Sequence, residues 1–307
     1  MAGAEIEISV VISTRNRAAL LSEALRALSE QAIPGNSFEV LVVNDGSTDA
    51  TEAMVKDRAS SFPALLRVLT LEPAGPARAR NAGIREARGR IIAFTDDDCL
   101  PEPDWLSKVC EGYEQDQGLA GIGGQTLPLE PQNLFSRYQD LLLHQPHQDQ
   151  TGITFLLTNN ASFRRDRLLE VGGFDEAFPF AGGEDVDLSR RMRQQGYRLG
   201  YRPEAKVRHH HITTWRGYLR LCYRYGKGEA LLHRHYPAWY KILRTIWWGR
   251  RLLAWIFIPL LARRGRREQG LSWKEAWAFA ALKSGQEMIG YLGALSMLRW
   301  IVRGPKA

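Results

Sequence analysis

The chain has 307 residues, of which 44% are hydrophobic and 24% are charged, and its formal net charge is +7. This composition is typical of a folded globular protein and excludes an intrinsically disordered chain. The three cysteines show no CxxC spacing, which argues against a disulfide framework or a zinc site and favours a reducing compartment.

Charge and tryptophan are distributed unevenly along the chain. Residues 206–307 contain 20 Lys and Arg against 4 Asp and Glu, whereas residues 1–205 contain 21 basic and 30 acidic residues. Eight of the nine Trp lie in the basic part, and only Trp105 precedes it. We therefore expect two regions with different partners.

The first hundred residues alternate between short β-branched runs and segments with helical periodicity. This alternation predicts a Rossmann-like α/β fold, in which helices flank a mostly parallel sheet. In chain order, the predicted strands cover 6–13, 38–43, 65–71 and 90–95, and the predicted helices cover 17–31, 48–59 and 77–87.

Polar residues gather where three of these strands end, at 13–16, 44–47 and 96–98. In open α/β sheets, ligands bind beyond the carboxyl ends of the strands. The three clusters therefore predict a binding site along one edge of the sheet.

Asp96, Asp97 and Asp98 directly follow an apolar strand. Adjacent carboxylates repel one another unless a cation or hydrogen bonds compensate them. Hard oxygen ligands at a strand end suit Mg²⁺ or Mn²⁺ that bridges to a diphosphate. Because alternate residues of an extended segment point the same way, Asp96 and Asp98 could share a metal. A solvated acidic turn is the alternative interpretation.

Two later features could supply further chemistry. Glu184 and Asp185 precede a helix predicted over 186–195, so one carboxylate could act as a general base. Acidic residues at a helix N-terminus also occur simply because they interact favourably with the macrodipole. His209, in a run of three histidines, could complete a carboxylate metal site or belong to a surface histidine cluster.

Asp45 and Arg80 are weaker candidates when each is taken alone. Asp45 lies in a turn before a helix, where its neighbours Ser47 or Thr48 are expected to cap the helix. It can also accept hydrogen bonds from a nucleotide base or ribose. Arg80 begins a helix and could clamp a phosphate, or it could belong to a solvated helix face.

Taken together, these segments resemble the family 2 glycosyltransferases of the GT-A fold. Five matching stretches occur in the expected order and cover most of residues 6–210, which makes the resemblance far more specific than any single motif. They are SVVISTRNR at 9–17, VLVVNDGSTDAT at 40–51, ARNAGIREARGRIIAFTDDDCLPEPDWL at 79–106, LLTNNASFRRDRLLEVGGFDEAF at 156–178 and GGEDVDLSRRMRQQGYRLGYRPEAKVRHH at 182–210.

The resemblance implies an inverting, metal-dependent enzyme of the hexosyltransferase class. Its donor would be a nucleotide sugar, expected to be a UDP-sugar, and its cofactor Mn²⁺ or Mg²⁺. The acceptor would be a hydroxyl of a glycan or a lipid-linked acceptor, in the synthesis of a cell-envelope glycan or glycolipid.

The resemblance also implies a role for individual residues. Asp185, of the Glu184–Asp185 pair, would be the catalytic base, and Asn160 and Arg164 would lie near the sugar and the acceptor. Cys99 departs from the family pattern, in which many members carry an acid. The metal ligands would be Asp98, Asp96 and His209, with His210 as the fallback. The nucleotide would be bound by Thr14, Arg15, Asp45, Arg80, Asp96 and Asp97.

The expected GT-A catalytic domain covers 1–215, with the nucleotide sugar bound by about 1–100 and the acceptor side formed by about 101–215. Residues 216–307 are expected to form a basic, Trp-rich helical region. Its apolar stretch at 252–262 is shorter than the roughly 20 residues that span a bilayer. Trp and Arg at the edges of apolar helices favour the headgroup zone of anionic membranes.

We therefore expect peripheral association with the cytoplasmic side of the cell membrane. A helical subdomain of a cytoplasmic protein, packed on the catalytic core or forming a dimer interface, is the alternative. Nucleic acid is not an expected partner, because the Trp residues lie in long apolar helices and not among scattered basic residues.

Two other functions compete with glycosyl transfer. A nucleotidyltransferase on a similar sheet is disfavoured by the Glu184–Asp185 pair and by the lack of a Gly-rich, Lys-containing triphosphate loop near residue 15. A non-catalytic nucleotide-sugar-binding protein is disfavoured because Asp96, Asp98 and Asp185 are all present.

Overall fold

The computed structural model describes residues 6–303 except for residue 36, residues 144–145, residues 234–257 and residue 270. The described chain forms two compact units. The first consists of Met1–Gln132 and Gln139–His211, and the second of Asn133–Tyr138 and Ile212–Ala307. The segment Asn133–Tyr138 joins the second unit through tertiary contacts, which no sequence feature predicted.

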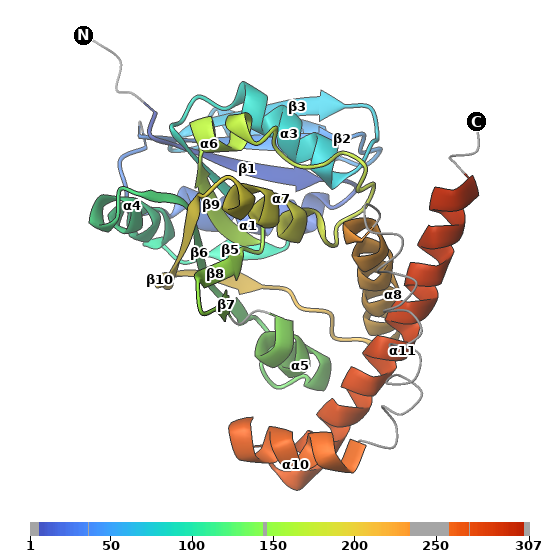
Figure 1. The fold of residues 1–307 in the computed structure, drawn as a ribbon. Coiled ribbons are helices and arrows are strands. Elements are labelled where there is room, and N and C mark those ends of the chain that lie inside the picture. The colour runs from blue at the N-terminus through green and yellow to red at the C-terminus, as the bar shows by residue number, and fades with distance from the viewer. Residues whose placement is uncertain (1–5, 36, 144–145, 234–257, 270, 304–307) are drawn as a thin grey trace. The chain divides into compact units, whose positions relative to one another are not determined.

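An eight-stranded sheet forms the centre of the first unit (Figure 1). Strands β1, β2 and β3 and the pair β1 and β4 are parallel, as are β6 and β10, whereas β9 runs antiparallel between β4 and β6. In sheet order, the strands are β3 (Leu65–Leu71), β2 (Phe38–Asp45), β1 (Ile8–Thr14), β4 (Ile91–Thr95), β9 (Asn160–Arg164), β6 (Leu119–Pro128), β10 (Arg198–His209) and β5 (Cys99–Pro101). This confirms the predicted mostly parallel α/β sheet.

Helices cover both faces of this sheet (Figure 1). They are α1 (Ala18–Ser29), α2 (Thr51–Ala59), α3 (Pro76–Glu86), α4 (Trp105–Gln115), α6 (Arg165–Glu170) and α7 (Glu184–Gln194). Alternate side chains of β1 and β2 pack in one core with apolar residues of α1, α2 and α4. On the other face, α3 approaches so closely that a Cβ on Gly83 would lie 2.4 Å from Cγ1 of Val11.

Two helices begin at different residues from those expected. Helix α2 starts at Thr51 and not at 48, because Thr48 donates its backbone N–H to Asn16 Oδ1 in the turn and Asp49 accepts from Thr51. Helix α7 starts at Glu184 and not at 186, because Gly183 adopts a left-handed φ of 101° that turns the chain into the helix. Glu184 and Asp185 therefore occupy the first turn of α7.

A small hairpin of β7 (His147–Asp149) and β8 (Gly152–Phe155) follows the helix α5 (Leu134–Leu143). Strand β8 contacts both β10 and α7. The hairpin thus lies against the half of the sheet that begins at β9.

The second unit contains the helices α8 (Trp215–Leu232), α10 (Ile258–Gln269) and α11 (Trp273–Arg303), with the start of α5. Helices α8 and α11 touch at Gly226 and Gly290, where a Cβ on Gly226 would overlap the carbonyl of Gly290. Among the residues that the structure describes, no helix has the length and apolarity needed to cross a bilayer. Most of the apolar stretch predicted at 252–262 lies outside the described residues.

Candidate active site

The carboxyl ends of β1, β2 and β4 meet at one edge of the sheet, as predicted. Thr14 closes β1, Asp45 closes β2, and Asp96 directly follows β4. The hydroxyl of Thr14 donates a hydrogen bond of 2.7 Å to Asp97 Oδ2. The first strand and the acidic loop are therefore joined directly, across 83 positions of sequence.

Arg17 binds the acidic loop with both arms of its guanidinium. Nη1 lies 2.7 Å from Asp97 Oδ1 and Nη2 lies 2.7 Å from Asp98 Oδ2. Burial raises the pKa of Asp97 to about 7 even though the Arg17 charge opposes that rise. Burial alone would also raise the pKa of Asp98, but the hydrogen bond from His209 and the Arg17 charge hold it well below its usual range. Asp98 therefore stays ionised more firmly than Asp97.

Asp98, Cys99 and His209 form a group of potential metal ligands among the described residues. Nε2 of His209 lies 3.2 Å from Asp98 Oδ1, and these two side chains and Cys99 offer ligand atoms within 4.8 Å of one another. Burial raises the pKa of the Cys99 thiol well above its usual value, which keeps the thiol protonated and a poor ligand. A carboxylate with an imidazole fits Mn²⁺ or Mg²⁺.

Arg80 connects the acidic loop to the start of α7. This residue is 4% exposed; its Nη2 lies 3.1 Å from Asp96 Oδ1 and its Nη1 lies 2.8 Å from Glu184 Oε1. Burial would lower the pKa of Arg80, but the charges of Asp96 and Glu184 outweigh this effect and raise it. Arg80 is thus a permanently charged link that brings residues 96 and 184 to the same place.

Asp185 lies beside this link and is partly exposed. Its Oδ1 accepts from the backbone N–H of Val186 at 2.8 Å. Burial, followed by the negative charge of Glu184, raises the pKa of Asp185 to about 7. A carboxylate with a pKa near neutrality is suited to accept a proton in general-base catalysis.

Asp45 shapes the neighbouring loop. Its two carboxylate oxygens accept the backbone N–H groups of Ala74 at 2.8 Å and Gly75 at 3.0 Å. These bonds hold the turn that leads into α3, and so they position Arg80. Arg15 is exposed at the same edge of the sheet, after the end of β1.

The structure corrects the expectation for Arg164. Because β9 is antiparallel to β4, Arg164 pairs with Ile91 at the start of β4, and only Asn160 pairs with Thr95 beside the acidic loop. Arg164 donates to the carbonyls of Leu119 and Gln117 at the opposite end of the sheet. It therefore lies too far from the acidic loop to contact a sugar there.

Asn160 lies at the expected edge, but its amide is used inside the protein. Its Oδ1 accepts from Nε1 of Trp105 at 2.9 Å, and its Nδ2 donates to the carbonyls of Gln125 and Ala205. Its side chain therefore joins α4, β6 and β10.

Arg17 is the residue of this site that the sequence reasoning missed. The only available signal was its position at the end of the first polar cluster. Its partners are 80 and 81 positions away, and only the parallel pairing of β1 with β4 brings them within reach.

Comparison with known proteins points to glycosyltransferases. The family model described as glycosyl transferase family 2 matches residues 9–172, and the one described as glycosyl transferase family group 2 matches residues 91–283. Glycosyltransferase AglE of Haloferax volcanii is 28% identical over 72% of this chain and 72% of its own length. The pre-mycofactocin glycosyltransferase of Mycobacterium tuberculosis is 29% identical over 85% of this chain and 54% of its own length. The chain thus spans about half the length of that mycobacterial relative.

Two solved structures show the same fold. The mannosyltransferase PcManGT from Pyrobaculum calidifontis, in complex with GDP-Man and Mn²⁺, aligns with a TM-score of 0.59 at 20% identity over 98% of this chain and 76% of its own. TarS of S. aureus, in complex with UDP-GlcNAc, aligns with a TM-score of 0.56 at 16% identity over 96% of this chain and 92% of its own. These likenesses support a GT-A-type fold.

The matched segment 9–172 contains the acidic loop, Arg17 and Arg80, and it covers more than half of the chain. The sheet, the order of its motifs and the family model therefore lead to one assignment: the chain belongs to glycosyltransferase family 2.

Proposed function

We propose that this protein transfers a sugar from a nucleotide-sugar donor to a hydroxyl group of an acceptor, with inversion at the anomeric carbon. The observation that carries the proposal is the Arg80 link, which holds the start of α7 against the acidic loop. A base at residue 185 thereby comes close to carboxylates suited to a metal-bound diphosphate. PcManGT and TarS, which share the fold, were solved with the nucleotide sugars GDP-Man and UDP-GlcNAc.

Asp185 is the proposed general base. Glu184 is engaged by Arg80 and by the backbone N–H of Gly182, so its carboxylate serves to position the first turn of α7. Asp185 would take the proton of the acceptor hydroxyl as that oxygen attacks the anomeric carbon from the face opposite the diphosphate. A single base and a single displacement invert the configuration, and the transition state has oxocarbenium character.

Asp98 and His209 would hold Mn²⁺ or Mg²⁺, with Asp96 and Arg80 beside them. When bound, such a metal neutralises charge that develops on a leaving diphosphate. Thr14, Asp45 and Asp97 would form the nucleotide side of the site. Of the possible donors, we propose a UDP-sugar.

The direct test is to replace Asp185 with Asn. Removal of a general base typically costs about 10²–10⁴-fold in rate, so transfer should fall by that factor while nucleotide binding, measured by thermal shift, stays intact. Asp166→Asn, on the exposed first turn of α6, is the matched control and should leave transfer unchanged. Transfer by Asp185→Asn within tenfold of the unmodified enzyme would contradict this assignment.

We further propose that the second unit binds the cytoplasmic surface of the cell membrane peripherally, where a glycan or lipid-linked acceptor of envelope synthesis would be available. Trp273 and Trp277 are one turn apart on α11 and are 47% and 46% exposed. The guanidinium of Arg266, on α10, lies 4.8 Å from the centroid of the Trp273 ring. Exposed Trp beside Arg suits the headgroup zone of an anionic bilayer.

Vesicle flotation of the full chain tests this proposal. The double variant Trp273→Ala/Trp277→Ala should float less with vesicles that contain phosphatidylglycerol than the unmodified chain does. Leu169→Ala, which removes an equally exposed apolar side chain from α6, should float normally. Equal flotation of all three chains would exclude these tryptophans as a membrane contact.

A further inference from the structure

A continuous series of side-chain contacts runs from the end of β1, through the acidic loop, to the end of β10. In order, its members are Thr14, Asp97, Arg17, Asp98 and His209. Roles in binding the nucleotide or the metal are proposed above for the other four members, but not for Arg17. The position of Arg17 in the middle of the series shows what it contributes.

The sheet fixes the main chain of both proposed metal ligands. Strands β5 and β10 pair antiparallel, with Cys99 opposite His209. The backbone N–H of His210 donates to the carbonyl of Asp98 at 2.9 Å. These bonds do not fix the rotation of the Asp98 carboxylate, and the terminal torsion of an Asp side chain is intrinsically broad. Its orientation therefore depends on contacts to the carboxylate itself.

The two oxygens of Asp98 have different partners. Oδ1 lies 3.2 Å from Nε2 of His209, whereas Oδ2 lies 2.7 Å from Nη2 of Arg17. Ligand atoms on neighbouring corners of an octahedral Mg²⁺ with bonds of about 2.1 Å are about 3 Å apart. Oδ1 and Nε2 thus already have the spacing of two metal ligands, while Arg17 holds the other oxygen. The carboxylate is oriented to bind a cation through one oxygen.

The guanidinium of Arg17 is itself anchored. Its Nη1 lies 2.7 Å from Oδ1 of Asp97, which is buried and accepts at Oδ2 from the hydroxyl of Thr14. A guanidinium presents its N–H donors in a rigid planar fork. The bond to Asp97 therefore determines the direction of the bond to Asp98.

The main chain on both sides of Arg17 is also held, by the turn that follows β2. Asn16 adopts a left-handed φ of 55°, and its Oδ1 accepts from the backbone N–H of Thr48 at 2.7 Å. The backbone N–H of Ala18 donates to Asp49 at 3.1 Å. Arg17 thus approaches the acidic loop from a fixed point.

We propose that Arg17 is a positioning residue of the metal site, which holds the carboxylate of Asp98 so that one oxygen faces His209 and a divalent cation. The inference rests on the metal-binding role proposed above, but not on sugar transfer. Hydrogen-bonded partners of metal ligands typically contribute about 10–100-fold to metal affinity. Loss of the Arg17 fork should therefore weaken metal binding by a factor in that range.

The positive charge of Arg17 acts in the opposite direction, because it repels a cation. The Arg17 side chain is 42% exposed, so water weakens this repulsion. A variant that keeps the charge separates the two effects. Arg17→Lys retains the charge but replaces the planar fork with a single ammonium group, which does not reproduce the paired bonds to Asp97 and Asp98.

The test is a titration of the full chain with Mn²⁺ alone, followed by electron paramagnetic resonance. In Arg17→Lys the dissociation constant of Mn²⁺ should rise about 10–100-fold. The spectrum of the bound ion should also broaden, because a rotating carboxylate gives a less uniform coordination. Arg26→Lys is the matched control, since Arg26 on α1 is 62% exposed and pairs with Glu30 at 3.2 Å. It should bind Mn²⁺ as the unmodified chain does.

A second pair of variants tests the anchor of Arg17 without changing any charge. Thr14→Val removes the hydroxyl that donates to Asp97. It should weaken Mn²⁺ binding, but less than Arg17→Lys does. Thr14→Ser keeps the hydroxyl and should bind Mn²⁺ normally. Thermal melting of each variant without metal shows that the fold is retained.

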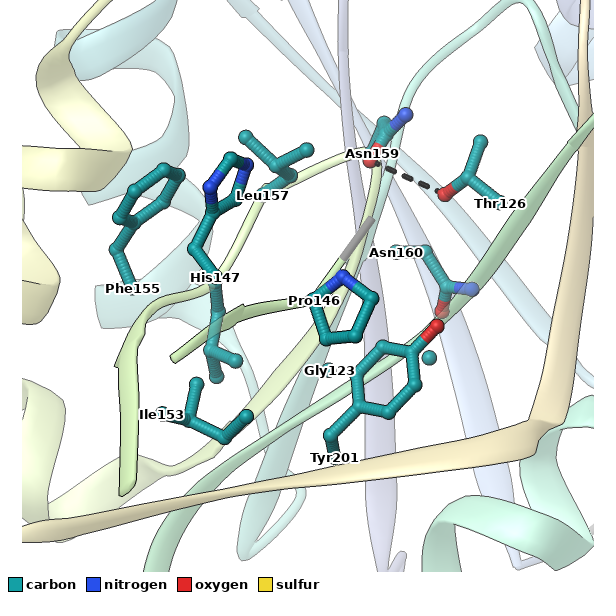
Figure 2. A pocket seen from close by; sticks show the side chains of 12 residues that line it. Gly123, Thr126, Pro146, His147, Ile153, Phe155, Leu157, Asn159, Asn160 and Tyr201 are labelled. Atoms are coloured by element: carbon teal, nitrogen blue, oxygen red, sulfur yellow. Dashed lines mark hydrogen bonds between the residues drawn. The ribbon is translucent and has the colours of Figure 1, made fainter. Parts of the chain in front are cut away.

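The Mn²⁺ that these titrations detect can be assigned to the acidic loop. The pocket over β6 and β10 (Figure 2) is lined by His147 but, among its described lining residues, by no Asp or Glu. It therefore offers a divalent cation no carboxylate. Asp98→Asn removes one proposed ligand and should abolish most of the binding. Unchanged binding in Asp98→Asn would place the ion elsewhere, and the inference would be wrong.

The remaining outcomes distinguish this inference from the proposed function. Equal Mn²⁺ affinity in the unmodified chain and Arg17→Lys, or higher affinity in the variant, would show that Arg17 does not position Asp98. Absence of Mn²⁺ binding in every chain would overturn both the metal site and the role of Arg17. The expected loss of affinity in Arg17→Lys, combined with no sugar transfer by the unmodified chain, would support the role of Arg17 and count against the proposed enzyme activity.

Discussion

In the proposed mechanism, Arg80 determines which of the two adjacent acids, Glu184 or Asp185, is available as the base. A buried guanidinium is costly unless it is paired and hydrogen-bonded, and Asp96 and Glu184 provide the two partners. This pairing gives the Glu184 carboxylate a structural role. Asp185 belongs to the same turn, forms no ion pair with the described residues, and keeps a carboxylate whose pKa is raised to about 7.

The pH dependence of activity should follow from that raised pKa. Because a raised pKa favours the protonated acid, the basic form of Asp185 is lost as the pH falls below about 7. The value of kcat/KM, which reports the free enzyme, should fall about tenfold per pH unit below that point. Glu184→Gln removes the neighbouring negative charge and should move this acidic limb to lower pH. A limb that stays in place or moves to higher pH would contradict the assigned cause.

At the scale of elements, strand β9 lies between the two halves of the sheet and carries Asn160, whose side chain bonds to neighbouring elements. It is antiparallel to both β4 and β6, and Asn160 at its start bonds to Trp105 of α4 and to carbonyls of residues 125 and 205. Trp105 is fully buried, so its indole N–H has no access to water. The role of Asn160 is therefore to hold the start of β9 to α4, β6 and β10.

Replacing Asn160 with Ala should lower the free energy of unfolding by about 2–3 kcal/mol, because it leaves a buried indole N–H and two backbone carbonyls without their partner. Chemical denaturation of the full chain measures this change. Normal stability combined with a raised KM for the acceptor would instead support the direct sugar contact that the sequence suggested.

Helix α3 carries Arg80 and depends on Gly83 for its close approach to the sheet. Gly83→Ala should destabilise the protein by about 1–3 kcal/mol, since the added methyl group would overlap the Val11 side chain. Gly285→Ala is the contrasting case, because no atom lies within 4 Å of a Cβ at that position of α11. It should stabilise the protein by about 0.4–1 kcal/mol. The thermal midpoint should fall for Gly83→Ala and rise for Gly285→Ala. A midpoint that rises in both variants would show that the close packing of α3 on the sheet does not limit the stability of the protein.

At the scale of the whole molecule, the net charge has opposite signs in two parts of the chain. Residues 1–205 are net acidic, and residues 206–307 are net basic. Residues 206–307 carry 20 basic against 4 acidic residues, and this excess attracts anionic surfaces over a distance that salt controls. In the proposed membrane contact, the exposed tryptophans on α11 would contribute an attraction that salt does not screen.

Binding to anionic vesicles should therefore weaken in two stages. Raising the ionic strength from about 0.1 M to about 1 M shortens the screening length from about 10 Å to about 3 Å and should remove most, but not all, of the flotation. In Trp273→Ala/Trp277→Ala the residual salt-resistant binding should disappear as well. Flotation that does not change with salt would exclude a role for the basic residues.

The sequence by itself determined the order and approximate bounds of the first four strands, and with them the sheet edge at which the carboxylates meet. These features depend on local periodicity and on the general rule that parallel strands end at one edge. The five motifs, read together, also led to the family that the comparisons then supported.

Only the tertiary structure decided what each charged group does, because the partners are distant in the chain. Arg80 and Glu184 are 104 positions apart, and Arg17 and Asp98 are 81 apart. Arg164 lies at the wrong end of the sheet because β9 is antiparallel, a direction that five residues of sequence do not encode. The β7–β8 hairpin likewise contacts β10 and α7 through side-chain packing that no local sequence pattern encodes.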